Sequence, residues 1–141
     1  MNLEGRKAGN GLKHSSLTQR IITAALTVHR ELGPGFLESV YEEALAIEFE
    51  ACGLKFERQK TVPVAYRGRP IGEHRLDFLV EGCVNVELKA VKALEDVFFA
   101  VVRSYLKASA LETALLMNFA AMPMTIRRVG REHSYYHETG E

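Results

Sequence analysis

A predicted β-hairpin at residues 75–90, RLDFLVEGCVNVELKA, constrains the fold of this chain more than any other stretch. Apolar residues alternate with other residues on both sides of a turn at Glu81-Gly82: Leu76, Phe78 and Val80 before it, and Val84, Val86, Leu88 and Ala90 after it. Both apolar sets face the same side of the sheet only in the register that pairs Leu76 with Leu88, Phe78 with Val86 and Val80 with Val84. This register places Asp77 opposite Glu87 and Arg75 opposite Lys89.

Asp77 and Glu87 would then be carboxylates directly across a strand pair, where like charges destabilise a sheet unless a positive group lies with them. A divalent cation is one such group, and Lys89, on the same face as Glu87, is another. Oxygen ligands suit Mg²⁺, which typically takes one or two carboxylates and completes its shell with water and substrate phosphate. The alternative interpretation is an ordinary solvated face, on which Asp77 pairs diagonally with Lys89 and Glu87 with Arg75.

The length and composition indicate one globular domain. With 141 residues, of which 47% are hydrophobic and 26% charged, the chain is long enough for one hydrophobic core and too short for two domains. We expect a flexible N-terminal segment at residues 1–14, a single domain at 15–131 and a C-terminal tail at 132–141. No apolar run approaches a membrane span and the N-terminus lacks a signal-peptide pattern, so we expect a cytoplasmic protein. The net charge of zero argues against bulk electrostatic coating of nucleic acid.

The hydrophobic periodicity predicts helices before and after the hairpin. A capping-box pattern at Ser16 and Gln19 begins the first helix. Pro63 indicates either an edge strand or a bulge in the strand that contains it, because proline cannot donate a ladder hydrogen bond. The predicted elements are a helix at 16–32, a helix after Gly35 that runs to Ala51, a strand at 55–66, the hairpin, a helix at 95–110, a buried strand at 114–119 and a peripheral strand at 124–129. The helix at 95–110 is apolar over most of its surface, so we expect it to pack against the sheet with little of that surface exposed. This order predicts an α/β fold with a central mixed sheet of four to five strands flanked by helices, the first and third on opposite faces.

Glu38 is a further candidate, because its spacing from Tyr41 places it on the face of the second helix that we expect to point inward. A buried carboxylate needs a partner, although an acidic residue in the first turn is also stabilised by the helix macrodipole alone. His29 lies on the shoulder of an apolar stripe, which favours a hydrogen-bonded structural histidine over a ligand or base. Cys52 and Cys83 match no metal spacing or disulfide framework and are expected to be small buried apolar residues.

The order of elements, together with Asp77, Glu87 and Lys89, resembles the PD-(D/E)XK nuclease superfamily, whose core places an Asp on the second strand and Glu-x-Lys on the third. The stretch GFLESVY at residues 35–41 resembles the motif that names the GxxExxY protein family within this superfamily. Three further stretches also fit: HRELGPG at 29–35, VELKAV at 86–91 and SYLK at 104–107. The similarity covers residues 17–130 and implies a restriction-endonuclease-like core.

The resemblance implies a metal-dependent nuclease, a hydrolase that cleaves phosphodiester bonds of nucleic acid, with DNA as the expected substrate. Asp77, Glu87 and the backbone carbonyl of Leu88 would hold Mg²⁺, for which Mn²⁺ could substitute. Glu38 would add an acidic ligand or hold a water molecule. Lys89 would orient or help deprotonate the attacking water and stabilise negative charge on the phosphate. No membrane partner is expected, and a homodimer would address both strands of a duplex.

One position departs from the pattern of the superfamily. Related nucleases often carry a Gln four residues before a Tyr on the helix after the Lys, whereas here Val101 lies four residues before Tyr105. The substrate contact that the Gln provides would then be missing. The alternative function is a catalytically weak or inactive module with the nuclease fold, which binds nucleic acid or a protein partner.

Overall fold

The computed structural model describes residues 14–131, so the predicted N-terminal segment, apart from His14, and the predicted tail at 132–141 lie outside the described residues. The elements, in chain order, are α2 (Ser15–Leu32), α3 (Glu38–Ala51), β1 (Phe56–Tyr66), β2 (Arg69–Val80), β3 (Val84–Lys89), α4 (Asp96–Ser109), β4 (Thr113–Asn118) and β5 (Thr125–Gly130). Every predicted helix and strand is therefore present. Across the described range, no helix combines the length and the apolar composition needed to cross a membrane.

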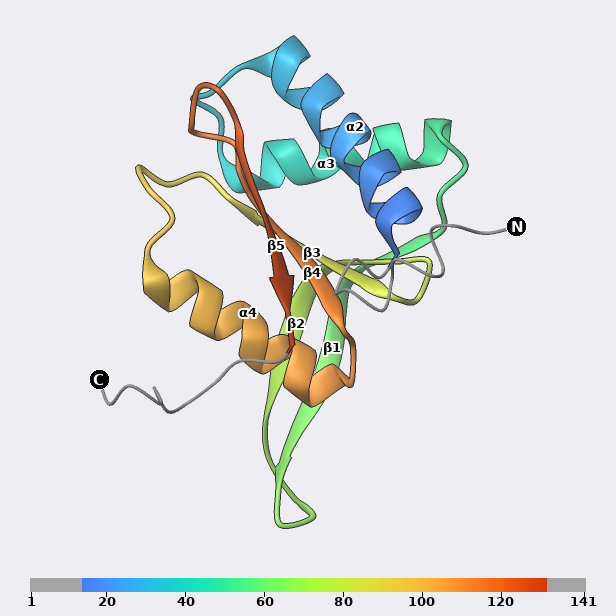
Figure 1. The fold of residues 1–141 in the computed structure, drawn as a ribbon, viewed down its shortest axis with the longest axis vertical. Helices are drawn as coiled ribbons and strands as arrows, with labels where there is room; N and C mark the ends of the chain where they lie inside the picture. Colours follow the sequence, from blue (N-terminus) through green and yellow to red (C-terminus); the bar gives the residue numbers. More distant parts are fainter. Residues whose placement is uncertain (1–13, 132–141) are drawn as a thin grey trace.

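The strands form one five-stranded sheet in the order β1-β2-β3-β4-β5 (Figure 1). β1, β2 and β3 are antiparallel neighbours, β3 and β4 are parallel, and β5 returns antiparallel to β4. A parallel pair needs a crossover connection, and α4 supplies it between β3 and β4. The prediction of a mixed sheet of four to five strands is confirmed, and β1, which contains Pro63, is an edge strand as predicted.

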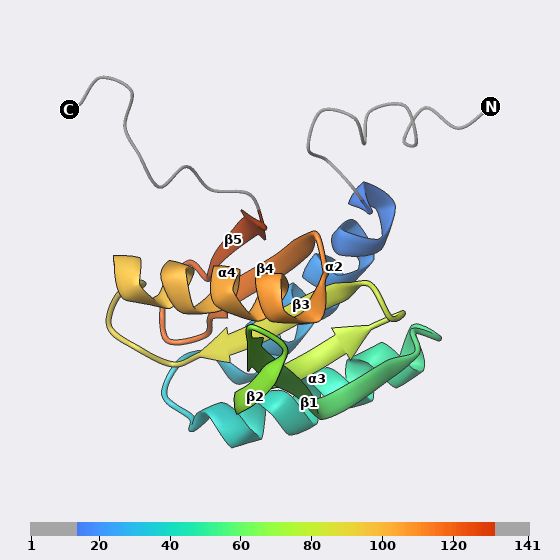
Figure 2. The ribbon, with the colours of Figure 1, turned by 90° about the horizontal axis from the view of Figure 1, so that it is seen from below.

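Helices cover both faces of the sheet, as Figure 2 shows. α2 and α3 share the larger core with one face, where Tyr41, Phe78 and Phe119 are fully buried. α4 packs on the other face through a smaller cluster that includes Leu106 and Leu116. β4 lies between the two layers, and each of its residues is buried. The predicted arrangement, with the first and third helices on opposite faces, is confirmed.

Two predictions about α2 differ from the structure. Ser16 lies inside the helix and not at its N-cap, because the helix begins one residue earlier and the carbonyl of His14 accepts the Thr18 N–H at 2.8 Å. His29 is buried, but its Nε2 atom has no hydrogen-bond partner among the described residues. Its ring centroid lies 6.3 Å from that of Phe119. Packing against an aromatic ring, and not a hydrogen bond from Nε2, therefore holds the side chain.

α4 buries much less of its surface than predicted. Along this helix only Val102 and Leu106 are buried, whereas Val97 is 56% exposed and Val101 is 39% exposed. The helix rests on the sheet along one narrow stripe, so its apolar composition overstates the area it covers. The prediction of buried cysteines is likewise wrong for Cys52, which is exposed after the end of α3.

β2 and β3 form the predicted hairpin but separate before its full predicted length. The turn at Glu81-Gly82 has φ of 52° and 69° at its two residues. Two predicted pairs form, Phe78 with Val86 and Val80 with Val84, and the ladder ends there. Three predicted pairs are therefore absent from the ladder: Leu76 with Leu88, Asp77 with Glu87, and Arg75 with Lys89.

β2 leaves β3 because it stays paired with β1 as far as Tyr66 and Arg69, in a hairpin that extends away from the body of the domain (Figure 1). Gln59 of β1, at the level of Asp77, has φ of 52°, a left-handed conformation that breaks the regular pleat. Leu76 consequently lies apart from the larger core and lines a cavity of about 430 Å³ beside α4. We call the place where the two strands separate the fork; Asp77 on β2 and Glu87 and Leu88 on β3 border it.

The side chain of Tyr41 holds the loop before α3 by two hydrogen bonds. Its buried hydroxyl donates to the carbonyl of Gly33 at 2.6 Å and accepts the N–H of Phe36 at 3.2 Å. Tyr41→Phe should lower the free energy of unfolding by about 1–3 kcal/mol, because both backbone groups lose their partner. Urea unfolding measures this loss. Tyr66→Phe is the matched control at an exposed tyrosine, and an equal loss in the two variants would contradict the role given to the Tyr41 hydroxyl.

Candidate active site at the fork

At the fork, two carboxylates take the place of the missing backbone pairing. The N–H of Asp77 donates to Oε2 of Glu87 at 3.0 Å, and the N–H of Leu88 donates to Oδ2 of Asp77 at 2.8 Å. Each acidic side chain is thus held by the backbone of the opposite strand, so both carboxylates lie in the same gap. The sequence predicted their closeness correctly, but through a direct cross-strand pair; the structure brings them together by these reciprocal bonds.

Glu87 is a buried carboxyl group with an unusual pKa. Only 5% of the residue is exposed. Burial, followed by the charge of Asp77, raises the pKa of Glu87 to about 9, against its ordinary value of 4.5, and Lys89 offsets only part of this. A pKa this high favours the protonated form of Glu87 at neutral pH in the absence of a cation, because two ionised carboxyl groups held this close repel each other.

Lys89 and α4 form one wall of the site. The Nζ of Lys89 lies 4.9 Å from the centroid of the Phe98 ring, a cation–π contact that holds the ammonium toward α4. Tyr105, from the same helix, lies close enough to the fork that, after burial, the charges of Glu87 and Asp77 raise its pKa. The acidic pair, the lysine and the tyrosine are therefore neighbours.

Glu38 reaches the end of β3 but does not join the acidic pair. It is the first residue of α3, is exposed, and its Oε2 accepts the N–H of Ala90 at 3.3 Å. The inward orientation expected from its helical spacing is wrong, because at the first position of a helix the side chain still lies beside the loop. In the part of the chain that the structure describes, it makes no hydrogen bond to Asp77 or Glu87. Its partner, Ala90, directly follows Lys89 in the chain, so Glu38 lies at the rim of the site.

The donor set of the fork fits a hard divalent cation. Within residues 14–131, no three His, Cys, Asp or Glu side chains are grouped to hold a metal by themselves. Asp77 and Glu87 supply two carboxylates and Leu88 a backbone carbonyl on the same strand as Glu87, which is the partial shell that Mg²⁺ usually accepts from a protein before water and phosphate complete it. The raised pKa of Glu87 agrees with this fit, since a cation would remove the reason for holding a proton.

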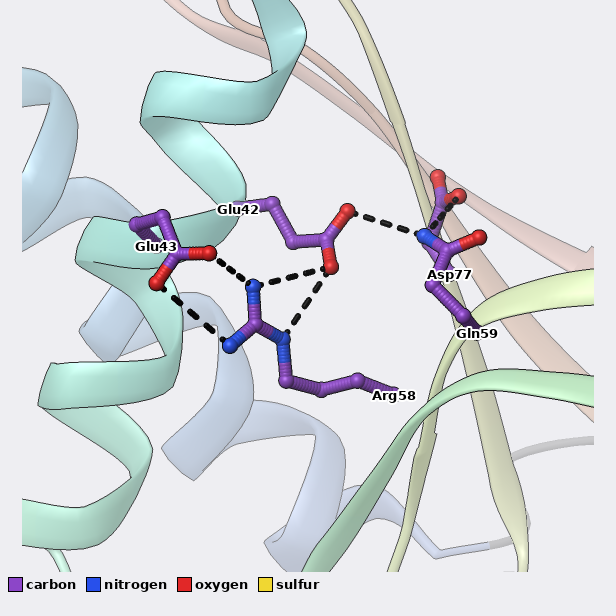
Figure 3. A network of polar contacts seen from close by, with 5 residues as sticks. All are labelled: Glu42, Glu43, Arg58, Gln59 and Asp77. Carbon is purple, nitrogen blue, oxygen red and sulfur yellow. Dashed lines mark hydrogen bonds and ion pairs between the residues drawn. The ribbon is translucent and has the colours of Figure 1, made fainter.

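Several neighbours of the acidic pair were absent from the predicted site. The Gln59 amide lies between Glu42 of α3 and Asp77 (Figure 3), and the His74 ring centroid lies 4.3 Å from that of Tyr105. No regular spacing in the sequence relates these residues to Asp77, so the sequence did not indicate them. Only the pairing of β1 with β2 and the docking of α3 and α4 bring them to the fork.

The sequence model of the PD-(D/E)XK nuclease superfamily matches residues 15–129, which is most of the chain and includes every residue of the fork. No curated protein and no solved structure gives a significant match.

The raised pKa of Glu87 predicts how stability depends on pH in metal-free protein. Between the unfolded value of 4.5 and the folded value of about 9, the folded state binds more protons than the unfolded state, so stability falls as pH rises. The slope should approach about 1.4 kcal/mol per pH unit from this group. Glu87→Gln cannot titrate and should lose less stability between about pH 5.5 and about pH 8.

Urea unfolding in the presence of a chelator measures this difference. Glu31→Gln, at an exposed position on α2, is the matched control and should keep the wild-type slope. If Glu87→Gln kept it as well, the buried carboxyl would not be the titrating group.

Proposed function

This chain belongs to the PD-(D/E)XK nuclease superfamily, and from that premise we propose that it is a Mg²⁺-dependent nuclease that hydrolyses phosphodiester bonds in DNA. The observation that carries the proposal is the reciprocal hold of Asp77 and Glu87 across the fork, with Lys89 on the same strand as Glu87. A purely structural ion-pair face, the alternative interpretation of these residues, would leave the charges solvated. Here one carboxyl is buried beside the other, and this burial raises its pKa.

Asp77, Glu87 and the Leu88 carbonyl would hold Mg²⁺, or Mn²⁺ in its place. When bound, the ion would neutralise charge on the scissile phosphate and make a bound water more acidic. Lys89 would orient the attacking water and stabilise the negative charge that develops on the phosphate. Its contact with Phe98 limits where its ammonium can go. Glu38, at the rim, would hold a further water molecule or act as an outer acidic ligand.

We also propose that the chain belongs to the GxxExxY family within the superfamily, because each named position of that motif has a physical role here. Gly35 has φ of 118°, which side chains other than glycine rarely adopt. Glu38 follows at the start of α3, facing the end of β3. Tyr41 ties the loop between them to α3 through its hydroxyl. The motif thus delivers one carboxylate to the rim of the fork.

Nucleic acid is the partner we propose, despite a net charge of zero. The tip of the β1–β2 hairpin carries Arg67 and Arg69, both exposed, and Arg75 is exposed nearer the fork on the same strand as Asp77. Such a basic arm could contact backbone phosphates beyond the cleavage site. We place the protein in the cytoplasm and propose a homodimer as the form that cuts both strands of a duplex.

A second candidate function is a binding module that has the fold but cuts weakly or not at all. Val101 favours it: this residue lies four positions before Tyr105 on α4 and is 39% exposed, so no amide is available there to contact a substrate. Duplex DNA that is bound in a gel-shift experiment but left uncut in the cleavage assay below would establish this alternative.

Metal binding is the first test of the site. Isothermal calorimetry should show Mn²⁺ and Mg²⁺ binding to the wild type, and Asp77→Asn should weaken it by about 100-fold or more, beyond what changes outside the ligand set usually cost. Asparagine keeps an oxygen for the Leu88 N–H, so the fold should persist. The matched control is Asp96→Asn on α4. Equal binding by wild type and Asp77→Asn would refute the metal site.

Cleavage is the second test. Plasmid and oligonucleotide substrates should be cut only with added Mg²⁺ or Mn²⁺, and Lys89→Ala should lower the rate by a factor on the order of 10²–10³, because the developing charge loses its ammonium. Lys92→Ala, at an exposed lysine in the next loop, should cut like the wild type. Cleavage that persisted in Lys89→Ala would point to a contaminant or to another mechanism.

A further inference from the structure

We propose that Gln59 is a positioning residue for Asp77, and that Glu42 of α3 in turn holds Gln59. The Nε2 of Gln59 lies 2.9 Å from Oε1 of Glu42 and 3.4 Å from Oδ1 of Asp77, between the two carboxylates (Figure 3). The consequence for metal binding rests on the function proposed above. The hold on Asp77 itself does not, because it belongs to the metal-free protein.

The orientation of the Gln59 amide follows from its neighbours. Glu42 and Asp77 offer oxygens that only accept hydrogen bonds, so the amide must present its NH₂ group, with its two N–H donors, to both. The opposite orientation would place the amide oxygen against two carboxylates. Glutamine is thus suited to this place because a neutral group with two donors can join two anions.

The left-handed backbone of Gln59 puts the side chain where it can do this. Its φ is 52°, and the regular pairs on either side of it in the ladder are Arg58 with Phe78 and Lys60 with Leu76. A non-glycine residue in this conformation costs free energy, and such conformations occur often at functional sites. Here the irregular residue is the one at the level of Asp77, where β2 leaves β3.

Arg58 supplies the positive charge that lets Glu42 lie so near Asp77. Its guanidinium contacts Glu42 at 3.0 Å and Glu43 at 2.6 Å, both on α3 (Figure 3). The side chain of Glu42 is only 16% exposed, whereas that of Glu43 is 70% exposed. Glu43 therefore shares the ion pair without taking part in the contact with Gln59, which makes it a natural control.

Asp77 is consequently held at both oxygens. Oδ2 accepts the N–H of Leu88 at 2.8 Å, and Oδ1 faces the amide of Gln59. A carboxylate fixed in this way needs no reorientation when a cation arrives, and partners outside the ligand set typically change metal affinity 10–100-fold. Glu38, one helical turn before Glu42, is positioned by the same docking of α3.

The test compares Gln59→Leu with Gln19→Leu, the same substitution at an exposed site on α2. In metal-free protein, the amide of Leu88 should exchange faster with solvent and its proton should shift upfield by NMR in Gln59→Leu only, since Asp77 is less well held. By calorimetry, Mn²⁺ affinity should fall by about 10-fold or more in Gln59→Leu and stay unchanged in Gln19→Leu. Wild-type Leu88 exchange in Gln59→Leu would overturn the proposal.

Glu42→Ala and Glu43→Ala separate the relay from the ion pair. Each removes one partner of Arg58, but only Glu42→Ala releases the Gln59 amide, so only that variant should speed Leu88 exchange and weaken Mn²⁺ binding. The double variant of Gln59→Leu with Glu42→Ala should be no worse than Gln59→Leu alone. Equal effects of Glu42→Ala and Glu43→Ala would overturn the relay. If the wild type bound no Mn²⁺, the proposed nuclease site would fail, and Leu88 exchange would still decide whether Gln59 holds Asp77.

Discussion

The separation of β2 from β3 beyond the Phe78–Val86 pair, on the side away from the turn, is the constraint on which the candidate site depends. A sheet that stayed paired would use the N–H groups of Asp77 and Leu88 in its own ladder, and its carboxylates would stand out from the pleat. Because the strands part, those N–H groups turn to side chains, and two acidic groups enter the gap. Burial in the gap, followed by the charge of Asp77, raises the pKa of Glu87. The candidate cation site is thus formed at an interruption of regular structure rather than by an added loop.

The sequence predicted the elements well because their signals are local. The alternation of apolar residues predicted the hairpin turn and the pairs nearest to it, and Pro63 indicated the edge strand. Alternation could not predict where pairing stops, because that depends on β1, whose Gln59 adopts a left-handed conformation at the level of Asp77. The apolar composition of α4 predicted a buried helix, but burial depends on how many layers of the structure cover a helix. The same limit hid Gln59 and Glu42, which lie 17 residues apart and meet through tertiary packing.

α3 connects three features that are separate in the sequence. Its first residue, Glu38, contacts the end of β3; Tyr41 anchors the preceding loop; and Glu42 and Glu43 bind Arg58 of β1. The buried face of the helix packs in the larger core, so its polar contacts act on a rigid support. A shift of this helix would move Glu38 at the rim of the site and loosen the hold on Asp77 at the same time. The geometry of the site therefore depends on the short segment between Gly35 and Glu43.

The exposed apolar residues of α4 lie on the helix that forms one wall of the candidate site. In the proposed nuclease, the helix that forms one wall of the site has to leave the fork open to a polymeric substrate. α4 packs on the sheet through Val102 and Leu106, while nearer its N-terminal end Phe98 lies against Lys89. Val97 and Val101 on the same helix are exposed. Val101 lies one helical turn before Tyr105, so an amide at position 101 would lie on the same face of α4 as Tyr105. Its absence is the reason that a binding module is the second candidate function.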